Sequence, residues 1–319
     1  MTRNGQAGAP GLPGRAEPRS ITDAEFALFQ GLIRREAGIF LIPAKKALLE
    51  GRLARRLREL GLRSFGAYYR RVVEEDKEEL VCLLNCICTN ETHFFREPQH
   101  FDFLQHQIIP EWVAQAAQGQ RSRRVRVWSA ACSTGEEPYS LAMTLLDQLP
   151  PSAGWEIEIL ATDLSTRALD QARAAIWPME KAGEIPPQYL KRYMLRGART
   201  QEGRMKAGPA IRSVIRFQRL NLSGETYPVT GLFDLIFCRN VLIYFDPDMR
   251  GRVTRRLLQH LEPTGYLFLG HAETLNGVSD RFRSVIPTVY GHARDPQQAP
   301  DTPVERTMGN GPLRDACAG

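Results

Sequence analysis

Between residues 124 and 270 the chain alternates short apolar segments with longer amphipathic ones, and this pattern restricts its fold more than any other feature. We expect strands over residues 125–129, 156–161, 214–218, 233–238 and 266–270, and helices over residues 138–149, 166–176 and 248–261. Strands that alternate with helices predict an α/β fold with a mostly parallel sheet that helices cover on both faces. Because ligands of such sheets bind beyond the carboxyl ends of the strands, functional residues are expected directly after each strand.

Residues 20–90 have a different pattern, which predicts a small all-helical domain. A capping box at residues 22–25 precedes apolar residues at helical spacing. A second helix is expected between Pro43 and Gly61, with three leucines along one face: Leu49, Leu53 and Leu57.

The two ends of the chain, residues 1–19 and 294–319, are rich in polar residues, Gly and Pro, which predicts disordered tails. The expected organisation is therefore a tail, a helical domain over 20–90, an α/β domain over 91–293 and a second tail. The N-terminus lacks the apolar stretch of a signal peptide, and no apolar run is long enough to cross a membrane. We therefore expect a cytoplasmic protein that does not insert into the membrane.

The net charge of +6 and the pI of about 9.1 favour an acidic partner. The basic residues are concentrated over residues 45–71, which carry nine Lys or Arg against two Glu. Such a segment either binds the acidic partner or forms a solvated helix face.

Three of the six cysteines, Cys82, Cys86 and Cys88, lie close together in the sequence. They could form a metal site, or they could be reduced thiols that pack on a helix as small apolar side chains. Because the chain has no Cys-x-x-Cys pair, the second interpretation is favoured and no metal is expected.

The first predicted strand ends in a run of small residues, 129–135, followed by Glu136, Glu137 and Pro138. Small residues allow a ligand to approach the backbone closely, but no Gly-Lys-Ser/Thr follows, so this is not a phosphate-binding P-loop. Two glutamates would repel a phosphate and suit a cationic group. Their alternative role is to complement the dipole of the helix that begins here.

The second predicted strand ends at Asp163, 28 residues after Gly135. An acidic residue at this place can accept hydrogen bonds from both hydroxyl groups of a ribose. The alternative is that it caps the next helix. Together with the small-residue loop, the ribose interpretation predicts a nucleoside that carries a positive charge, and S-adenosylmethionine fits that description.

Four motifs, at residues 89–97, 129–139, 161–163 and 237–246, resemble in sequence and in order those of the chemotaxis receptor glutamate methyltransferases, the CheR family. The resemblance covers about residues 20–292. It implies a Rossmann-like methyltransferase sheet that uses S-adenosylmethionine, a small N-terminal all-helical domain and a small antiparallel β subdomain within residues 178–220.

The resemblance also implies roles for individual residues. An acidic pair contacts the methionyl end of the cofactor, Asp163 the ribose, residues 221–222 the adenine, and residues 238–240 the methionyl and sulfonium region. The implied cofactor-binding residues are Asn90, Thr92, Arg96, Glu136, Glu137, Asp163, Asn221, Leu222, Cys238, Arg239 and Asn240. Two are expected at the reaction itself: Arg96 would orient the carboxylate of the acceptor or that of the cofactor, and Tyr244 would shape the methyl-transfer cleft.

The implied reaction transfers a methyl group from S-adenosylmethionine to glutamate side chains of a receptor, giving methyl esters and S-adenosylhomocysteine. A glutamate with a pKa of about 4.3 is already an anion at neutral pH, so alignment and desolvation are expected to suffice without a general base. The implied partners are cytoplasmic helices of methyl-accepting chemotaxis receptors, which Arg55, Arg56 and Arg58 would steer electrostatically. A long loop at residues 196–203 indicates either a site for a C-terminal receptor peptide or a plain surface hairpin.

Two other functions remain open at this point. The basic pI suggests a nucleic-acid methyltransferase, but residues 240–244 read Asn-Val-Leu-Ile-Tyr in place of an Asn/Asp-Pro-Pro-aromatic motif, and no Pro-Cys occurs. A non-catalytic module that only senses S-adenosylmethionine would keep the same fold, because fold does not prove turnover.

Overall fold

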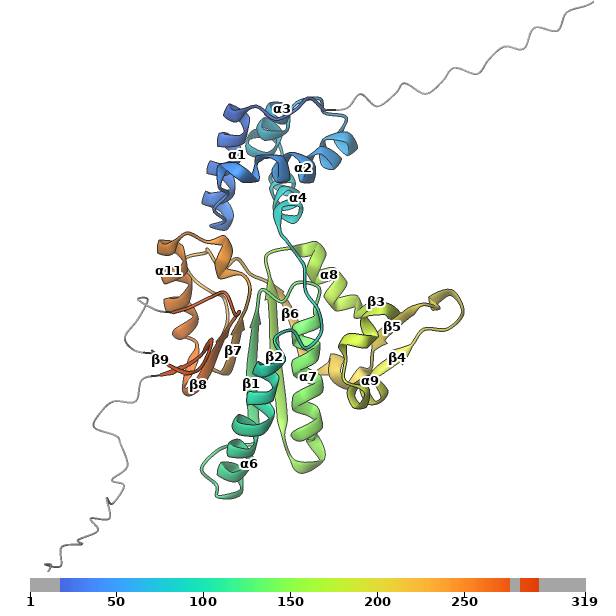
Figure 1. Ribbon diagram of the computed structural model, residues 1–319, viewed down its shortest axis with the longest axis vertical. Helices are drawn as coiled ribbons and strands as arrows, with labels where there is room; N and C mark the ends of the chain where they lie inside the picture. Colours follow the sequence, from blue (N-terminus) through green and yellow to red (C-terminus); the bar gives the residue numbers. More distant parts are fainter. Residues whose placement is uncertain (1–17, 276–281, 293–319) are drawn as a thin grey trace, which may run out of the picture.

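The computed structural model describes residues 18–275 and 282–292. The two expected tails lie almost entirely outside these residues. The described part consists of a helical N-terminal domain that stands over one end of a large sheet, and a small second sheet beside it (Figure 1). Among the described residues, none of the helices combines the length and apolarity that a membrane crossing requires.

The N-terminal domain contains α1 (Asp23–Ala37), α2 (Lys46–Leu60), α3 (Phe65–Arg70) and α4 (Lys77–Ile87). The capping box at the start of α1 is confirmed, because the Thr22 side chain accepts from the Glu25 backbone and the Glu25 side chain accepts from the Thr22 backbone. The predicted leucine face of α2 is buried against α1, α3 and α4. Residue Gly61 ends α2 in the left-handed conformation at φ 68°.

All five predicted strands are present in a seven-stranded sheet. Its strands are β1 (Arg124–Ala130), β2 (Glu156–Asp163), β6 (Ile215–Arg219), β7 (Phe233–Cys238), β8 (Leu261–Leu269), β9 (Phe282–Ile286) and β10 (Val289–His292), in the order β6-β2-β1-β7-β8-β10-β9. The first five run parallel, whereas β10 is antiparallel to both β8 and β9. The chain moves outward from β1 to β2 and β6 and then returns beside β1 as β7. A ligand site is therefore expected where the β1 and β7 ends meet.

Helices cover both faces of this sheet (Figure 1). Along β1 the side chains alternate, so that Val125 and Val127 pack with α6 (Ile109–Ala117) and α7 (Glu136–Gln148). Trp128 and Ala130 point to the other face and pack with α11 (Pro247–Leu258). The remaining helices of this domain are α5 (Pro98–Phe103), α8 (Thr166–Ala174), α9 (Pro187–Tyr193) and α10 (Pro209–Ser213).

The predicted antiparallel β subdomain is also present, as a three-stranded sheet in the order β3-β5-β4. Its strands are β3 (Ile176–Pro178), β4 (Met194–Arg196) and β5 (Arg204–Ala207). The helix predicted over 166–176 was therefore too long, because the chain turns at Ala175 (φ 56°) and Ile176 begins β3. The following Trp177 is buried edge-on against Phe94 and Tyr139, which fixes the subdomain to the main core. The helix predicted over 248–261 likewise ends early, at Leu258.

Candidate active site

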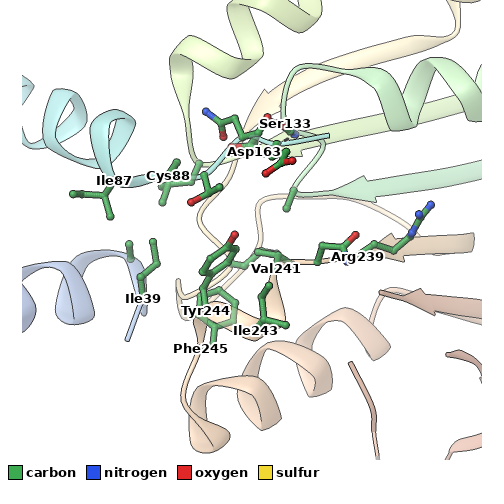
Figure 2. A pocket seen from close by; sticks show the side chains of 18 of the residues that line it. Ile39, Ile87, Cys88, Ser133, Asp163, Arg239, Val241, Ile243, Tyr244 and Phe245 are labelled. Atoms are coloured by element: carbon green, nitrogen blue, oxygen red, sulfur yellow. Dashed lines mark hydrogen bonds between the residues drawn. The ribbon is translucent and has the colours of Figure 1, made fainter. Parts of the chain in front are cut away.

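A cavity of about 1050 Å³ lies beyond the carboxyl ends of the parallel strands, between the sheet and the N-terminal domain. It is lined by ten of the residues that the family resemblance implied for the site: Asn90, Thr92, Arg96, Glu137, Asp163, Asn221, Leu222, Arg239, Asn240 and Tyr244. They come from segments far apart in the chain, and the fold brings them around one space. Figure 2 labels Asp163, Arg239 and Tyr244 among them. Glu136, Cys238, Arg55, Arg56 and Arg58 are not among the lining residues.

The loop that follows β1 bends sharply at the cavity wall. Ala131 (φ 73°), Ser133 (φ 50°) and Gly135 (φ 99°) all adopt the left-handed conformation, which is uncommon outside glycine. A Cβ atom at Gly135 would lie 2.9 Å from the Cβ of Ala172, so only glycine fits between this loop and α8. The small residues predicted to let a ligand approach therefore also allow the loop to fold tightly.

Asp163 lies at the end of β2 with its side chain at the cavity (Figure 2). One carboxylate oxygen accepts the Ser133 N–H group and the other accepts the Ser165 N–H group, both at 2.8 Å. Burial raises the pKa of this carboxyl group. The N-cap of α8 is Ser165, whose hydroxyl accepts from the Ala168 backbone, so Asp163 does not have the capping role that was its alternative.

The two adjacent glutamates of the β1–α7 loop point to different surroundings. Glu137 lines the cavity, accepts a 2.7 Å hydrogen bond from the Ser129 hydroxyl, and lies 3.5 Å from the Arg239 guanidinium. Burial raises the pKa of Glu137. Glu136 is instead buried in an ion pair with Lys181, at 2.5 Å between Oε1 and Nζ. The structure thus gives Glu136 a role in holding the subdomain segment and leaves Glu137 at the cavity.

Arg239, directly after β7, is buried between acidic groups. Its Nε lies 3.4 Å from the Glu97 carboxylate, and Nη2 donates to the carbonyl oxygen of Arg96. Arg239 therefore joins the β7 loop to the 89–97 motif and places Arg96 at the cavity. The neighbouring Cys238 is fully buried, and burial raises its pKa well above the usual value. Its side chain packs in the core, away from the cavity.

Glu273 organises the same loop, although no sequence motif pointed to it. Its buried carboxylate accepts the backbone N–H groups of Asn240 (2.9 Å), Leu242 (2.7 Å), Ile243 (3.3 Å) and Gly270 (2.7 Å). Four donors on one carboxylate hold the chain where Asn240 takes the left-handed conformation at φ 57°. The rule that functional residues follow strand ends would have found Glu273, because it lies four residues beyond the end of β8.

The N-terminal domain forms part of the cavity. The Phe40 N–H group donates to the Tyr244 carbonyl oxygen at 2.8 Å, and the Tyr244 side chain lines the cavity with its hydroxyl directed inward (Figure 2). The Asn221 amide donates to the Glu36 carbonyl oxygen at 2.6 Å, so its side chain holds the two domains together. Next to it, Leu222 is buried and gives the cavity an apolar wall.

The three arginines predicted for substrate docking differ in their surroundings. Arg56 makes two hydrogen bonds, at 2.8 and 2.6 Å, to the carboxylate of buried Glu79, which also accepts from the Tyr68 hydroxyl. It therefore joins α2 to α4 inside the domain. Arg55 is 80% exposed and, within the part of the chain that the structure describes, pairs only with Glu59 one turn along the helix; Arg58 is also exposed.

The clustered cysteines are free thiols, and Cys82 and Cys86 are half-buried on α4. Cys88 lines the cavity, and burial raises its pKa to about 12. In residues 18–275 and 282–292, no group of three or more His, Cys, Asp or Glu is arranged to hold a metal ion.

Comparison with known proteins identifies the family. Residues 90–290 match the family described as "CheR methyltransferase, SAM binding domain", and residues 24–88 match "CheR methyltransferase, all-alpha domain". The chain belongs to the CheR methyltransferase family. The predicted family and fold are confirmed, and so is the predicted S-adenosylmethionine-dependent chemotaxis methyltransferase activity.

Individual CheR relatives match almost over their whole length. A chemotaxis protein methyltransferase of Escherichia coli (strain K12) is 40% identical over 88% of this chain and 94% of its own. Chemotaxis protein methyltransferase 2 of Pseudomonas aeruginosa is 38% identical over 85% of this chain and 94% of its own. A chemotaxis protein methyltransferase of Borreliella burgdorferi is 35% identical over 85% of this chain and 95% of its own.

Proposed function

We propose that this CheR protein transfers the methyl group of S-adenosylmethionine to the side-chain carboxylates of specific glutamates on chemoreceptor helices, in the cytoplasm at the receptor arrays. The products are glutamate methyl esters and S-adenosylhomocysteine. One observation carries the proposal: a single cavity collects eight residues of the four methyltransferase motifs together with Asn221 and Leu222, with acidic groups on its inner wall and a mouth between the two domains.

The residues of the cavity fit S-adenosylmethionine by their chemistry. Each Asp163 oxygen accepts one backbone N–H group, which leaves acceptor capacity for the two ribose hydroxyls. Leu222 offers an apolar wall to the adenine ring, and Glu137 offers a negative charge to the ammonium group. Burial raises the pKa of both acids, so a cationic ligand would stabilise their ionised forms. When bound, the cofactor supplies a methyl group that its sulfonium makes electrophilic.

The chain's own residues would align the acceptor and exclude water. The acceptor carboxylate is an anion at neutral pH, so no proton has to be removed before it reacts. In this proposal Arg96 orients a carboxylate at the cavity, and Arg239 fixes Arg96 through its backbone. The Tyr244 hydroxyl shapes the cleft around the acceptor. Alignment and desolvation by these side chains account for the rate enhancement.

Receptor docking would use surfaces outside the cavity. Arg55 and Arg58 are exposed on α2 and would attract acidic receptor helices, whereas Arg56 is engaged with Glu79.

The β subdomain would bind a C-terminal receptor peptide. In support, β4 is an edge strand, and its Leu195 is 53% exposed. Removing the last residues of the receptor should then raise its KM.

The decisive experiment is methyl transfer from labelled S-adenosylmethionine to membranes that contain receptors, followed by alkaline treatment. Label that is released as methanol establishes a carboxyl ester. Label that survives alkali indicates N- or C-methylation and favours the nucleic-acid alternative, which a salt-sensitive complex with duplex DNA would support. Cofactor binding without any transfer to a cognate receptor favours the non-catalytic module.

A further inference from the structure

Four exposed large apolar side chains lie at the mouth of the cavity. Phe40 (48% exposed), Ile42 (45%) and Leu48 (42%) come from the N-terminal domain, and Ile243 (48%) comes from the loop after β7. We call these four residues the apolar rim. All four line the same cavity, although they come from two domains.

The rim is held in place by the contacts that join the domains. The Phe40 backbone bonds to Tyr244 at 2.8 Å, and Ile39 forms a β-bridge with Phe245. On the other side, the Ile243 N–H group is 3.3 Å from the Glu273 carboxylate. The backbone is therefore fixed at Phe40 and at Ile243, on the two sides of the opening. Clustered exposed apolar side chains are costly in water and mark interaction sites.

Basic residues share the opening with the rim. Lys45 and Arg250 line the same cavity, and so does Arg34, whose guanidinium lies 5.7 Å from the centre of the Phe40 ring. Asp246, which also lines the cavity, is paired with Arg34 at 2.7 Å. The mouth therefore combines apolar groups with cationic side chains, and the carboxylates of Glu91 and Asp248 line the cavity as well. It complements a partner surface that combines apolar side chains with carboxylates.

We propose that the apolar rim is a specificity-determining surface, which seats the helix turns on either side of the acceptor glutamate. This inference rests on the proposed function. A glutamate side chain has only two methylene groups, so its backbone must come close to the mouth before the carboxylate enters the cavity. On a helix, residues three or four positions away then face the rim. The preferred acceptor is a glutamate with apolar residues at i±3 or i±4, on an amphipathic helix.

The test compares the double variant Ile42→Ser/Leu48→Ser with Val113→Ser. Val113 is 43% exposed on α6, which lies at the end of the molecule away from the N-terminal domain (Figure 1). We expect the rim variant to raise the KM for the receptor about tenfold and to leave the Kd for S-adenosylmethionine and the melting temperature unchanged. Val113→Ser should change none of these values.

A second measurement separates this inference from the proposed function. Equilibrium binding of a receptor helix fragment, with S-adenosylhomocysteine present, is compared for the wild type and the rim variant. Serine in place of the apolar residues at i±3 and i±4 of the fragment should weaken binding to the wild type and have little further effect on the rim variant. If the rim variant and Val113→Ser bind the fragment equally and have equal KM values for the receptor, the proposed role of the apolar rim is wrong. Absence of methyl transfer by the wild type would overturn the proposed function. The binding comparison would still show whether the apolar rim binds the helix fragment.

Discussion

The backbone N–H group of Phe40 donates a 2.8 Å hydrogen bond to the carbonyl oxygen of Tyr244. This bond joins the N-terminal domain to the loop that carries the proposed active-site tyrosine. An ion pair of 2.7 Å between Arg34 and Asp246 reinforces the same contact. The cavity is thus built by both domains of the CheR fold, and the position of Tyr244 depends on the N-terminal domain as well as on the sheet.

Tyr244→Phe removes only the hydroxyl group that is directed into the cavity. We expect kcat to fall about tenfold, which corresponds to the loss of one hydrogen bond of ~1.4 kcal/mol in the transition state. The Kd for S-adenosylmethionine should stay within about twofold, as measured by calorimetry. Full turnover by this variant would remove Tyr244 from the mechanism.

Glu273→Gln tests the loop that follows β7. The amide would place an NH₂ group against backbone N–H donors, where the carboxylate now accepts from Asn240 and Gly270 at 2.9 and 2.7 Å. Displacement of the loop should lower kcat by about 10–100-fold, because small shifts at a reacting centre are costly. The control is the exposed Glu225→Gln. Normal kcat with a normal melting temperature would show that the loop keeps its position without Glu273.

Loss or reversal of the positive charges on α2 should have two different effects. Arg55→Glu and Arg58→Glu change exposed side chains, so they should raise the KM for the receptor, most strongly at low salt, and leave stability unchanged. Arg56→Ala should instead lower the free energy of unfolding by about 3–5 kcal/mol, because it leaves the buried Glu79 carboxylate without its ion pair. Urea unfolding measures the effect on stability, and receptor titrations measure the effect on KM. KM values for Arg55→Glu and Arg58→Glu equal to that of the wild type would argue against electrostatic docking on α2.

The pH dependence of stability should report on Glu25. Burial opposes ionisation of this carboxyl group, but hydrogen bonds from Thr22, Gly66 and Arg19 outweigh it and lower the pKa from 4.5 to about 2. Because the pKa is lowered in the folded state, Glu25 stabilises the fold above pH 4.5, and this contribution is lost as the pH falls toward 2. Glu25→Gln should therefore be less stable than the wild type by about 1–2 kcal/mol at pH 6. The difference should shrink at pH 3; a constant difference would contradict the assignment.

Most of the fold follows from patterns that are local in the sequence. The strand and helix periodicities located all five predicted strands, and the rule for strand ends pointed to Asp163, which the fold places at the cavity. Either Asp163 or Ser165 could cap α8 by residue type. The geometry of the loop makes Ser165 the N-cap. Local pattern thus predicted where the site lies, and the tertiary structure decided which residue has which role.

Local patterns do not separate the surroundings of individual residues where burial or distant partners decide them. Glu136 and Glu137 are adjacent residues of the same type, yet of the two only Glu137 lines the cavity. Glu136 instead pairs with Lys181 from the subdomain segment. The sequence predicted Arg56 as a surface charge. In the structure it is bound to the carboxylate of Glu79, which lies 23 residues later in the chain. The importance of Glu273 comes from backbone donors about 30 residues earlier. Contacts between residues so far apart in the chain cannot be predicted from local periodicity.

The cavity between the two domains is the proposed binding site of the cofactor. A crystal structure of the full chain with S-adenosylhomocysteine tests it most directly. We predict the nucleoside inside the cavity, with its ribose hydroxyls hydrogen-bonded to Asp163 and its amino-acid end toward Glu137. A nucleoside bound outside the cavity, or a ribose held by residues other than Asp163, would contradict the account.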